Sequence, residues 1–530
     1  MDLPLSFIFS VATIFGLLVF GYLAWIKARA NSSNNGKGKK VPEAVGSWPI
    51  IGHLHLLAGS QVHHKLLGSM ADKFGPIFTI KLGVHPVLIV SNSAMAKQCL
   101  TTNDRVFASR PKTMASEILG YNYATFGVAP YGPYWREIRK IILLELMSHQ
   151  SRKMFAHIRV SEVKSSISDM YKTCKRDEGS SEMMTKVEMK EWFGNLMLDI
   201  VVRMIFGVRF SHGQQNEDEY KKAIRRVFVL FGASVPSDAI PGLRWLDIGG
   251  YEKTMKKTAI EIDAMIDGWL EGHKKMLGFK EQANESTDRG FMAILLSRLQ
   301  ERKEDLYGFS TDVVVKSTCM ALLLAGTDTT SSTLTWALSL LVNNPHVLEK
   351  CQKELEKYVG KDRFVEESDL KNLVYLQAII KETMRLYPAA PLSLPHVSTD
   401  DCVVGGYSVP KGTRLMVNLW KIHHDPEVWT DPFEFQPERF LTSNKEIDVK
   451  GKHFELIPFS SGRRICPGIT FALEAIQLIL ANMIHGFEFQ NPSNDKIDMT
   501  ESPGLSNVKA SSLELLVSPR LPPHVYRVSI

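Results

Sequence analysis

The sequence predicts a mainly α-helical fold with minor β sheets, preceded by a single N-terminal transmembrane helix. The first observation is the number of long stretches with helical periodicity, such as "YWREIRKIILLELM" and "EWFGNLMLDIVVRMIFG". The second is the brevity of the β-like runs, of which "PIFTIKLG" and "HPVLIVS" come early. The third is an uncharged apolar stretch at the N-terminus. With 44% hydrophobic and 23% charged residues, the 530-residue chain has the composition of a folded globular protein.

The N-terminal segment from Leu3 to Ile26 is long enough to cross a membrane. It carries no charged residue, and its roughly 24 residues would span about 36 Å as a helix, against about 30 Å for a bilayer core. A cleaved signal peptide is the alternative, but the apolar region of such a peptide runs for only about 7–15 residues. Asp2 also stands where that alternative expects cations. Residues 1–26 are therefore predicted to form a transmembrane signal anchor.

A basic linker follows the predicted anchor. Cations cluster directly after it and turn-forming residues come next: Lys27, Arg29, Lys37, Lys39 and Lys40, then Pro42, Gly46, Pro49 and Gly52. Positively charged flanks stay on the cytoplasmic side of a membrane, so we expect the rest of the chain to face the cytosol. We predict a basic, Pro/Gly-rich linker over residues 27–52 and one large domain over residues 53–530.

Helical periodicity continues through the middle of the chain, in "YKKAIRRVFVLFG" and "EKTMKKTAIEIDAMIDGWLEGHKKML". The polar stretch "FKEQANESTDRG" is predicted to be a surface loop, and a strand-rich patch, "CVVGGYSVPKGTRLMVNLW", comes late. The net charge of +6 is modest for this length, and no dense basic stripe is present. The composition therefore argues against a nucleic-acid-binding protein.

The stretch "PFSSGRRICPG", residues 458–468, places one cysteine in a stiff and basic setting. Cys466 has three ordinary interpretations: half of a disulfide, a zinc ligand, or a small buried apolar residue. The chain has only six cysteines and no C-x-x-C pair, so the spacing typical of zinc-ribbon or thioredoxin sites is missing. A disulfide framework would need a denser set in a shorter secreted chain.

A second unusual stretch, "LLLAGTDTTSSTLTWALSLL", covers residues 322–341. Its apolar flanks predict one long buried helix, yet its middle holds hydroxyl and acidic side chains that compete for backbone hydrogen bonds. Ala325 and Thr329 lie four residues apart, on one face. A local opening beside Gly326 could seat a small ligand, with Asp328 and Thr329 handling protons. A loop joining two helices, or hydroxyls that merely bend one helix, is the alternative.

Two further patterns pair an arginine with a second functional side chain. In "KETMRLYP", Glu382 and Arg385 lie three apart on a helix that ends before Pro388, a spacing that usually marks a solvated surface pair. In "WREIR", Trp135 and Arg139 lie one turn apart and can present an indole N–H and a guanidinium together. A core tryptophan beside a surface arginine is the plainer interpretation of that second pattern.

Taken together, these patterns resemble one family, the cytochrome P-450 haem-thiolate monooxygenases. "FSSGRRICPG" is similar to the family's F-x-x-G-x-R-x-C-x-G loop, "AGTDTT" to its oxygen-activating A-G-x-D/E-T-T helix, and "ETMR" to its E-x-x-R motif. "PERF" (residues 437–440) and "WREIR" match the remaining two signatures, and the five occur in the family's order from about residue 40 to the end. The resemblance implies the cytochrome P-450 fold and a catalytic domain over residues 53–530.

The resemblance implies that Cys466 is the axial ligand of the iron of haem b, and a thiolate ligand favours O–O cleavage. Gly462 and Gly468 would let the loop approach the sulfur, Phe459 would shield it, and the N-terminus of the helix from Ile469 would favour its negative charge. Four residues resemble the family's haem-propionate partners: Arg464, Trp135, Arg139 and His396. The family often has arginine at the position of His396, which is expected to be a milder, pH-sensitive donor.

The resemblance also assigns the other motif residues. Ala325 and Gly326 would border the cofactor, and Asp328 and Thr329 would relay protons to dioxygen, which favours a true monooxygenase. A buried structural triad would lie behind the haem loop, formed by Glu382, Arg385 and Arg439.

Electrons must come from outside, because the chain has no G-x-G-x-x-G or flavin motif. The resemblance implies an endoplasmic reticulum enzyme that receives electrons from NADPH-cytochrome P-450 reductase. The reductase is expected to dock on the basic face near Cys466, where solvated charge is the alternative role of four candidate residues: Arg136, Lys140, Lys452 and Arg463.

The segments "PEAVGSWPIIGHLHLL" and "MTESPGLSNVKASSLELLVSPRL" resemble the plant microsomal branch grouped as family 82. That likeness implies a small apolar polycyclic substrate among plant specialised metabolites, facing residues 112–128, 228–235, 322–325, 390–394 and 505–508. Apart from Glu117 and Asp328, no acidic residue stands out there as an amine partner, which favours a flavonoid- or lignan-type phenolic or a terpenoid over an alkaloid. A haem-binding sensor that does not oxidise and a membrane-anchored interaction protein are the alternatives from other classes.

Overall fold

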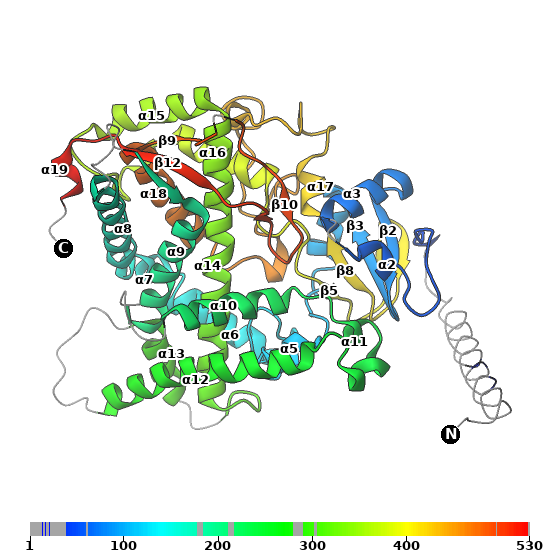
Figure 1. Cartoon of the computed structure of the whole chain (residues 1–530). Coiled ribbons are helices and arrows are strands. Elements are labelled where there is room, and N and C mark those ends of the chain that lie inside the picture. Colours follow the sequence, from blue (N-terminus) through cyan, green and yellow to red (C-terminus); the bar gives the residue numbers. More distant parts are fainter. Residues whose placement is uncertain are drawn as a thin grey trace, which may run out of the picture.

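The computed structural model describes residues 39–527, apart from 60–61, 177–183, 210–216, 279–289, 302–304 and 494, together with Thr13, Gly16 and Gly21. Helices form most of the body, the first strands (blue) lie at one side of it, and the last strand (red) lies toward the opposite side (Figure 1). Apart from those three residues, the predicted signal anchor lies outside the described residues, as does most of the predicted loop "FKEQANESTDRG".

The early helices and the strands of the first half of the chain are as follows: β1 (Lys39–Lys40), α2 (Leu54–Leu57), α3 (His63–Phe74), β2 (Ile77–Leu82), β3 (His85–Val90), α4 (Ser93–Lys97), the π-turn η1 (Gln98–Thr102), α5 (Met114–Ile118), α6 (Pro133–Glu145), α7 (His149–Met154), α8 (Ala156–Arg176), β4 (Thr185–Glu188), α9 (Met189–Phe206), α10 (Glu217–Phe231), α11 (Pro236–Ala239), the 3₁₀ turn η2 (Pro241–Leu246) and α12 (Tyr251–Gly278).

The second half of the chain continues with α13 (Phe291–Gln300), α14 (Thr311–Asn343), α15 (Pro345–Val359), η3 (Leu370–Asn372), α16 (Val374–Leu386), β5 (His396–Val397), β6 (Cys402–Val404), β7 (Tyr407–Val409), β8 (Arg414–Val417), α17 (Leu419–His423), η4 (Pro437–Phe440), η5 (Gly462–Arg464), α18 (Ile469–Gly486), β9 (Phe487–Gln490), β10 (Glu501–Ser502), β11 (Val508–Lys509), β12 (Glu514–Pro519) and α19 (Pro523–Tyr526). The predicted helices and the predicted early and late strands are confirmed by these bounds.

The strands form small sheets that join distant parts of the chain. The largest has the order β2-β3-β8-β5, with β2–β3 antiparallel and β3–β8 parallel, and Val87 lies opposite Arg414. The other described sheets have the orders β1-β7-β6, β4-β12-β9 and β10-β11. The C-terminal hairpin β10–β11 lies beside α14 (Figure 1), because Asn507 next to it accepts hydrogen bonds from that helix.

Helix α14 runs through the middle of the body and packs against α9, α13, α18, α16 and α12 (Figure 1). It is one continuous helix of 33 residues, so the alternative of a loop joining two helices is wrong. Its hydroxyls do not break the ladder because they donate back to carbonyls one turn earlier. Thr327 donates to Leu323 O at 2.8 Å, and Thr333 donates to Thr329 O at 2.9 Å.

The described part of the predicted linker lies against the body. Lys39 and Lys40 pair in parallel with β7, and Val41 and Ala44 are buried. Among the described residues, α18 is long and apolar enough to span a membrane, but two thirds of it (67%) is buried inside the fold. It is therefore a core helix of this domain.

The predicted triad of Glu382, Arg385 and Arg439 is buried and fully paired. Glu382 Oε2 accepts from Arg385 Nε at 2.7 Å, and Glu382 Oε1 accepts from Arg439 Nε at 3.0 Å. The remaining N–H groups of Arg385 donate to Glu382 and to the carbonyls of His423, Pro432 and Glu434. The pair is therefore not the solvated surface pair that its spacing alone suggests, and it ties α16 to the segment before the Cys466 loop.

We expect Glu382→Gln to destabilise the fold strongly. The amide would leave two buried guanidiniums without their counter-charge, and breaking a buried pair costs about 3–5 kcal/mol. Circular dichroism should show a clearly lower thermal unfolding midpoint. Asp169→Asn, which removes the exposed pair with Lys172 on α8, is the matched control and should change the midpoint little. An unchanged midpoint in Glu382→Gln would show that the triad does not hold this part of the fold.

Candidate active site

The Cys466 loop is held in one conformation by its own backbone. The Cys466 N–H donates to Phe459 O at 3.0 Å, and α18 begins at Ile469, three residues after the cysteine. Gly462 has φ of +71°, and a Cβ there would lie 2.3 Å from Leu100 O, so only glycine fits. The loop therefore presents one sulfur just before the N-terminus of a long helix.

The sulfur of Cys466 has no covalent partner. All six cysteines of the chain are free, and no group of three or more His, Cys, Asp or Glu side chains that could hold a metal ion occurs among the described residues. The disulfide and zinc interpretations of Cys466 are therefore wrong. Cys466 is only half-buried, so the plain core-residue interpretation does not suit it either.

The surroundings of Cys466 act on its pKa in opposite directions. Burial raises the pKa of the Cys466 thiol, whereas the Gly468 N–H and the Arg139 guanidinium lower it. The positive end of α18 favours the thiolate in the same way as these two groups. Arg139 also donates from Nη2 to Ile465 O at 2.8 Å, which fixes its side chain beside the loop.

Three arginines, Arg110, Arg139 and Arg464, converge beside this loop. Arg464 donates to Ala108 O at 2.6 Å and to Ala129 O at 2.5 Å. Burial, and then the charges of Arg110 and Arg139, lower the pKa of Arg464, although a guanidinium stays charged at neutral pH. Among the described residues, none of the three arginines is paired with a carboxylate.

Trp135 lies between two of these arginines and has an unpaired donor. Its ring centroid lies 4.3 Å from the Arg464 guanidinium carbon and 5.4 Å from that of Arg139. Trp135 is buried, and its Nε1–H meets no acceptor among the described residues. A buried unpaired donor beside unpaired cations marks a site for anionic oxygen atoms.

His396 lies in the same region. It is buried on β5, and its Nδ1 lies 2.6 Å from Phe107 O. Burial, and then the charge of Arg110, hold the pKa of His396 well below its ordinary value. Since Phe107 O can only accept, Nδ1 carries a proton in this hydrogen bond.

Arg110 is a site residue that the sequence analysis missed. Its Nη1 donates to Leu394 O at 2.6 Å and to Pro395 O at 2.9 Å, while its buried Nε has no acceptor. The charge of Arg110 acts on Arg464 and on His396, which places it in the group of Arg464, Arg139 and Trp135. In the sequence, Arg110 directly precedes Pro111, but its hydrogen-bond partners lie more than 280 residues away.

The polar middle of α14 presents different residues on different faces. Ala325 is exposed although its neighbours on the helix are mostly buried, and Thr329 Oγ1 donates to Ala325 O at 2.7 Å. Gly326 lies where a Cβ would be 3.1 Å from Val201 of α9. Asp328 Oδ2 accepts from Ser506 Oγ at 2.5 Å. Among the described residues, no hydrogen bond or ion pair joins Asp328 or Thr329 to the Cys466 loop, and α14 contacts α18, the helix that follows this loop.

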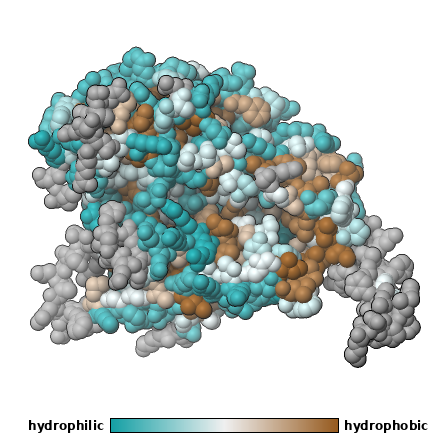
Figure 2. Space-filling model, viewed as in Figure 1, coloured by the Kyte–Doolittle hydropathy of each residue, from teal (hydrophilic) through white to brown (hydrophobic). Residues whose placement is uncertain are grey.

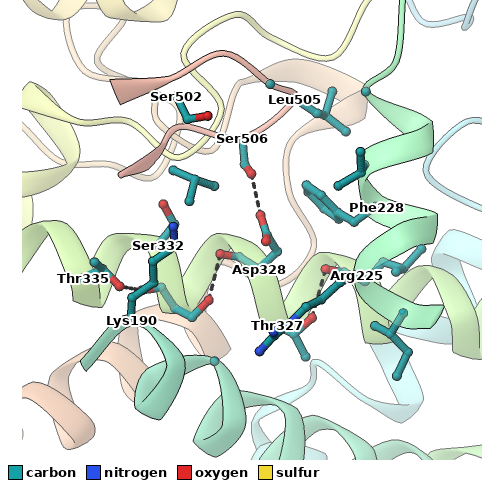
Figure 3. Close-up of a pocket in the computed structure, with 18 of the residues that line it drawn as sticks. Lys190, Arg225, Phe228, Thr327, Asp328, Ser332, Thr335, Ser502, Leu505 and Ser506 are labelled. Atoms are coloured by element: carbon teal, nitrogen blue, oxygen red, sulfur yellow. Dashed lines mark hydrogen bonds between the residues drawn. The ribbon is translucent and has the colours of Figure 1, made fainter. Parts of the chain in front are cut away.

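A cavity of about 900 Å³ lies on the Asp328 side of α14 (Figure 3). Lys190 of α9, Arg225 and Phe228 of α10, and Ser506 and Leu505 between β10 and β11 line it together with Asp328. Burial raises the pKa of Asp328, while the Ser506 hydrogen bond and the charges of Lys190 and Arg225 lower it. The cavity therefore surrounds one buried carboxylate with a hydroxyl donor and two cations.

Three of the five predicted substrate-facing segments line this cavity, namely residues 228–235, 322–325 and 505–508. Pro391 and Leu392 from the fourth segment line a second cavity of only about 20 Å³. Residues 112–128 line neither of these two cavities. Glu117 in that segment is bound on both oxygens by Arg244, at 2.9 and 3.0 Å.

The fold agrees with that of known proteins. The family model described as cytochrome P450 matches residues 42–516. A zebra fish cytochrome P450 solved with progesterone superposes with a TM-score of 0.73 at 27% identity, covering 87% of this chain and 100% of that chain.

Relatives of known name cover nearly the whole chain. A demethylepipodophyllotoxin synthase of Sinopodophyllum hexandrum is 49% identical, with 96% of each chain covered. A strychnine-10-hydroxylase of Strychnos nux-vomica is 46% identical (98% of this chain, 99% of the relative). A flavonoid-6-hydroxylase of Ocimum basilicum is 46% identical, with 98% of each covered. Other relatives of similar identity carry cytochrome P450 82 names, which confirms the family-82 resemblance. The chain therefore belongs to the cytochrome P450 family and is a haem-thiolate monooxygenase that uses dioxygen and electrons supplied by a reductase.

Proposed function

We propose that Cys466 would supply the thiolate ligand of the haem iron and that Arg110, Arg139, Arg464 and Trp135 would hold the two haem carboxylates. The observation that carries this proposal is the convergence of three guanidiniums and one orphaned indole N–H beside the cysteine loop. Two propionates would supply the missing negative charges and the missing acceptor. The residues present therefore fit haem, and His396 lies in the same region.

When bound, haem supplies the activation of dioxygen that places one oxygen atom on the substrate. The chain's own residues prepare that chemistry. Gly462 lets the loop turn tightly, and the Gly468 N–H and Arg139 favour an ionised sulfur. Phe459 packs beside the loop, where it would keep water from the sulfur of Cys466.

Proton delivery is assigned to the middle of α14. Ala325 is exposed on the side of the helix that Thr329 shares, whereas Gly326 lets α14 approach Val201 of α9. Asp328 takes a proton from the cavity side and passes it to the Thr329 hydroxyl, which gives its own proton onward. Asp328 then returns to its ionised form, so no net charge accumulates on the chain.

The substrate is proposed to be a neutral, apolar polycycle of plant specialised metabolism, a flavonoid- or lignan-type phenolic or a terpenoid. The flavonoid-6-hydroxylase relative is consistent with this class, and the strychnine-10-hydroxylase relative is consistent with the alkaloid alternative. One contact in this chain favours the neutral class. Glu117 is already paired with Arg244, so it is not free to pair with an amine.

The electron donor is proposed to be the NADPH-dependent reductase, docked on the basic face near Cys466. Arg136 and Lys140 of α6 and Lys452 are exposed and can meet an acidic partner. Arg463 is a weaker candidate than the sequence suggested, because its Nε is already paired with Asp104 at 3.3 Å.

The domain is proposed to lie on the endoplasmic reticulum membrane, held by the anchor over residues 1–26 and by an exposed apolar patch. The patch consists of Val45, Trp48, Ile50, Val84, Trp245, Leu246 and Ile248. Its parts are neighbours, because the Gly83 N–H donates to Ile51 O and the Val84 N–H donates to Ala239 O, just before η2. Figure 2 shows hydrophobic surface over the region where α11 lies in Figure 1. Large exposed apolar patches mark protein or membrane contacts.

The haem ligand is tested by the absorbance difference spectrum of dithionite-reduced membranes with and without carbon monoxide. We expect a red-shifted Soret band in the wild type and its loss in Cys466→Ala, because only a thiolate ligand gives that shift. Cys402→Ala, which removes another half-buried cysteine, is the matched control and should keep the band. A band that survives in Cys466→Ala would contradict the proposed ligand.

The substrate class is tested with the full-length enzyme and its reductase in microsomes, supplied with NADPH and a panel of phenolics, terpenoids and amine alkaloids. We expect an oxygenated product from a neutral polycycle, since Glu117 in the predicted substrate-facing segment 112–128 is already paired with Arg244. Mass spectrometry would identify the product and the added oxygen atom. Turnover confined to the amines would refute the proposed class while leaving the haem assignment intact.

The membrane patch is tested by tryptophan fluorescence of the full chain in vesicles with brominated acyl chains, which quench indoles that enter the bilayer. Trp48 and Trp245 are 58% and 81% exposed, so Trp48→Tyr and Trp245→Tyr should each lower the quenched fraction. Trp192→Tyr on α9 is the control and should not lower it. If neither patch variant lowers the quenched fraction, the anchor alone holds the protein on the membrane.

A further inference from the structure

Among the described residues, Ser506 is the one that donates a hydrogen bond to the Asp328 carboxylate. Ser506 is itself buried, at 6% exposure, and its hydroxyl donates to Asp328 Oδ2 at 2.5 Å (Figure 3). While it is ionised, the carboxylate has no hydrogen to donate, so it accepts in this contact. Among the described residues, no group donates to Asp328 Oδ1, so that oxygen is left for the cavity or for Thr329.

The position of Ser506 is set by α14 itself. The next residue, Asn507, accepts at its carbonyl from Ser332 Oγ at 2.6 Å and from Trp336 Nε1 at 2.7 Å. Asp328, Ser332 and Trp336 are spaced by four residues, so they lie on one face of the helix. The Asn507 N–H donates to Ala389 O at 2.8 Å, which fixes the other side of the segment. The turn between β10 and β11 is therefore pinned along two turns of α14.

We propose that Ser506 is a positioning residue for Asp328, holding one carboxylate oxygen so that the other oxygen exchanges protons between the cavity and Thr329. The proposal rests on the proposed relay role of Asp328. Thr329 donates its own hydroxyl hydrogen to Ala325 O, so its oxygen is open to accept a proton from the Asp328 side. Ser506 contributes no proton of its own to the relay.

Other charged groups also face Asp328 and bear on its protonation. Those that line the cavity with it come from the segment before α9, from α9, from α10, from the start of α12 and from β11: Glu188, Lys190, Glu191, Lys221, Arg225, Tyr251 and Lys509. Of these, Lys190 and Arg225 lower the pKa of Asp328 and burial raises it. Since the Ser506 hydrogen bond also lowers this pKa, its removal should make Asp328 hold its proton to a higher pH.

The test compares Ser506→Ala with Ser506→Thr and Ser332→Ala in the reconstituted holoenzyme with reductase, NADPH and a dihydroxyflavone as the probe. Ser506→Thr keeps a hydroxyl at the same position. Ser332→Ala removes a hydrogen bond between α14 and the same turn without touching Asp328, so it is the matched control for loosening of the hairpin. The readouts are the peroxide released per NADPH consumed and the rate of NADPH consumption as a function of pH.

We expect Ser506→Ala to slow NADPH consumption, or to raise the peroxide released per NADPH, by up to about tenfold. A misplaced functional group slows the step that it serves by such factors. The acidic limb of the pH profile should move to higher pH, because the ionised carboxylate is the form that accepts protons. Ser506→Thr should restore both readouts, and Ser332→Ala should leave the pH profile in place. If Ser506 only held the hairpin in place, Ser332→Ala and Ser506→Ala should change the peroxide yield and the pH profile alike.

The role of Ser506 and the haem assignment are tested by different readouts. Unchanged peroxide yield and pH profile in Ser506→Ala, with the carbon monoxide band retained, would overturn the positioning role but leave the haem assignment standing. Asp328→Asn serves as the reference variant and should lower the flux through the relay by about 100-fold. If Asp328→Asn has no effect, the relay role of Asp328 falls, and the role of Ser506 falls with it.

Discussion

The position of the Cys466 loop depends on one buried carboxylate. Glu382 accepts from both Arg385 and Arg439 at the junction of α16 with the segment 423–440. From there the chain of contacts continues, because Arg385 donates to His423 O and the His423 ring accepts from the Ile457 N–H at 3.0 Å. Residue 457 directly precedes the cysteine loop. A charge pair that would contribute little on the surface thus sets where the loop begins.

The site on the other side of that loop has the opposite charge balance. Glu382 is matched by two arginines, whereas the described residues give Arg110, Arg139 and Arg464 no carboxylate at all. Backbone carbonyls offset part of the cost of burying these cations, and the remaining positive charge is complementary to an anionic group. A protein that buries three unpaired guanidiniums beside an orphaned indole N–H is organised around a ligand that completes it. Haem has the two carboxylates that this environment lacks.

Helix α14 connects this site with the solvent side. One face of α14 holds Ala325 and Thr329. Asp328, the residue before Thr329, lies on a neighbouring face, where it lines a cavity together with α9, α10 and the β10–β11 segment. The helix can carry so many polar side chains without a break because hydroxyls such as those of Thr327, Thr329 and Thr333 donate to a carbonyl of the preceding turn. The cost of burying Asp328 is offset by the Ser506 hydroxyl and by two nearby cations.

The sequence by itself determined the features that depend on near neighbours in the chain. Helical periodicity predicted α6, α9, α10, α12 and α14, and glycine positions around Cys466 predicted a tight loop before α18, because such patterns act over a few residues. The tertiary structure alone decided the contacts between distant segments. Arg110 reaches carbonyls of residues 394 and 395, Arg244 occupies Glu117, and Ser506 reaches Asp328 across 178 residues. It also decided that the pKa of His396 lies below its ordinary value and that Lys39 and Lys40 pair with β7. Burial and hydrogen-bond partners set those properties, and both arise only when segments far apart in the chain come together.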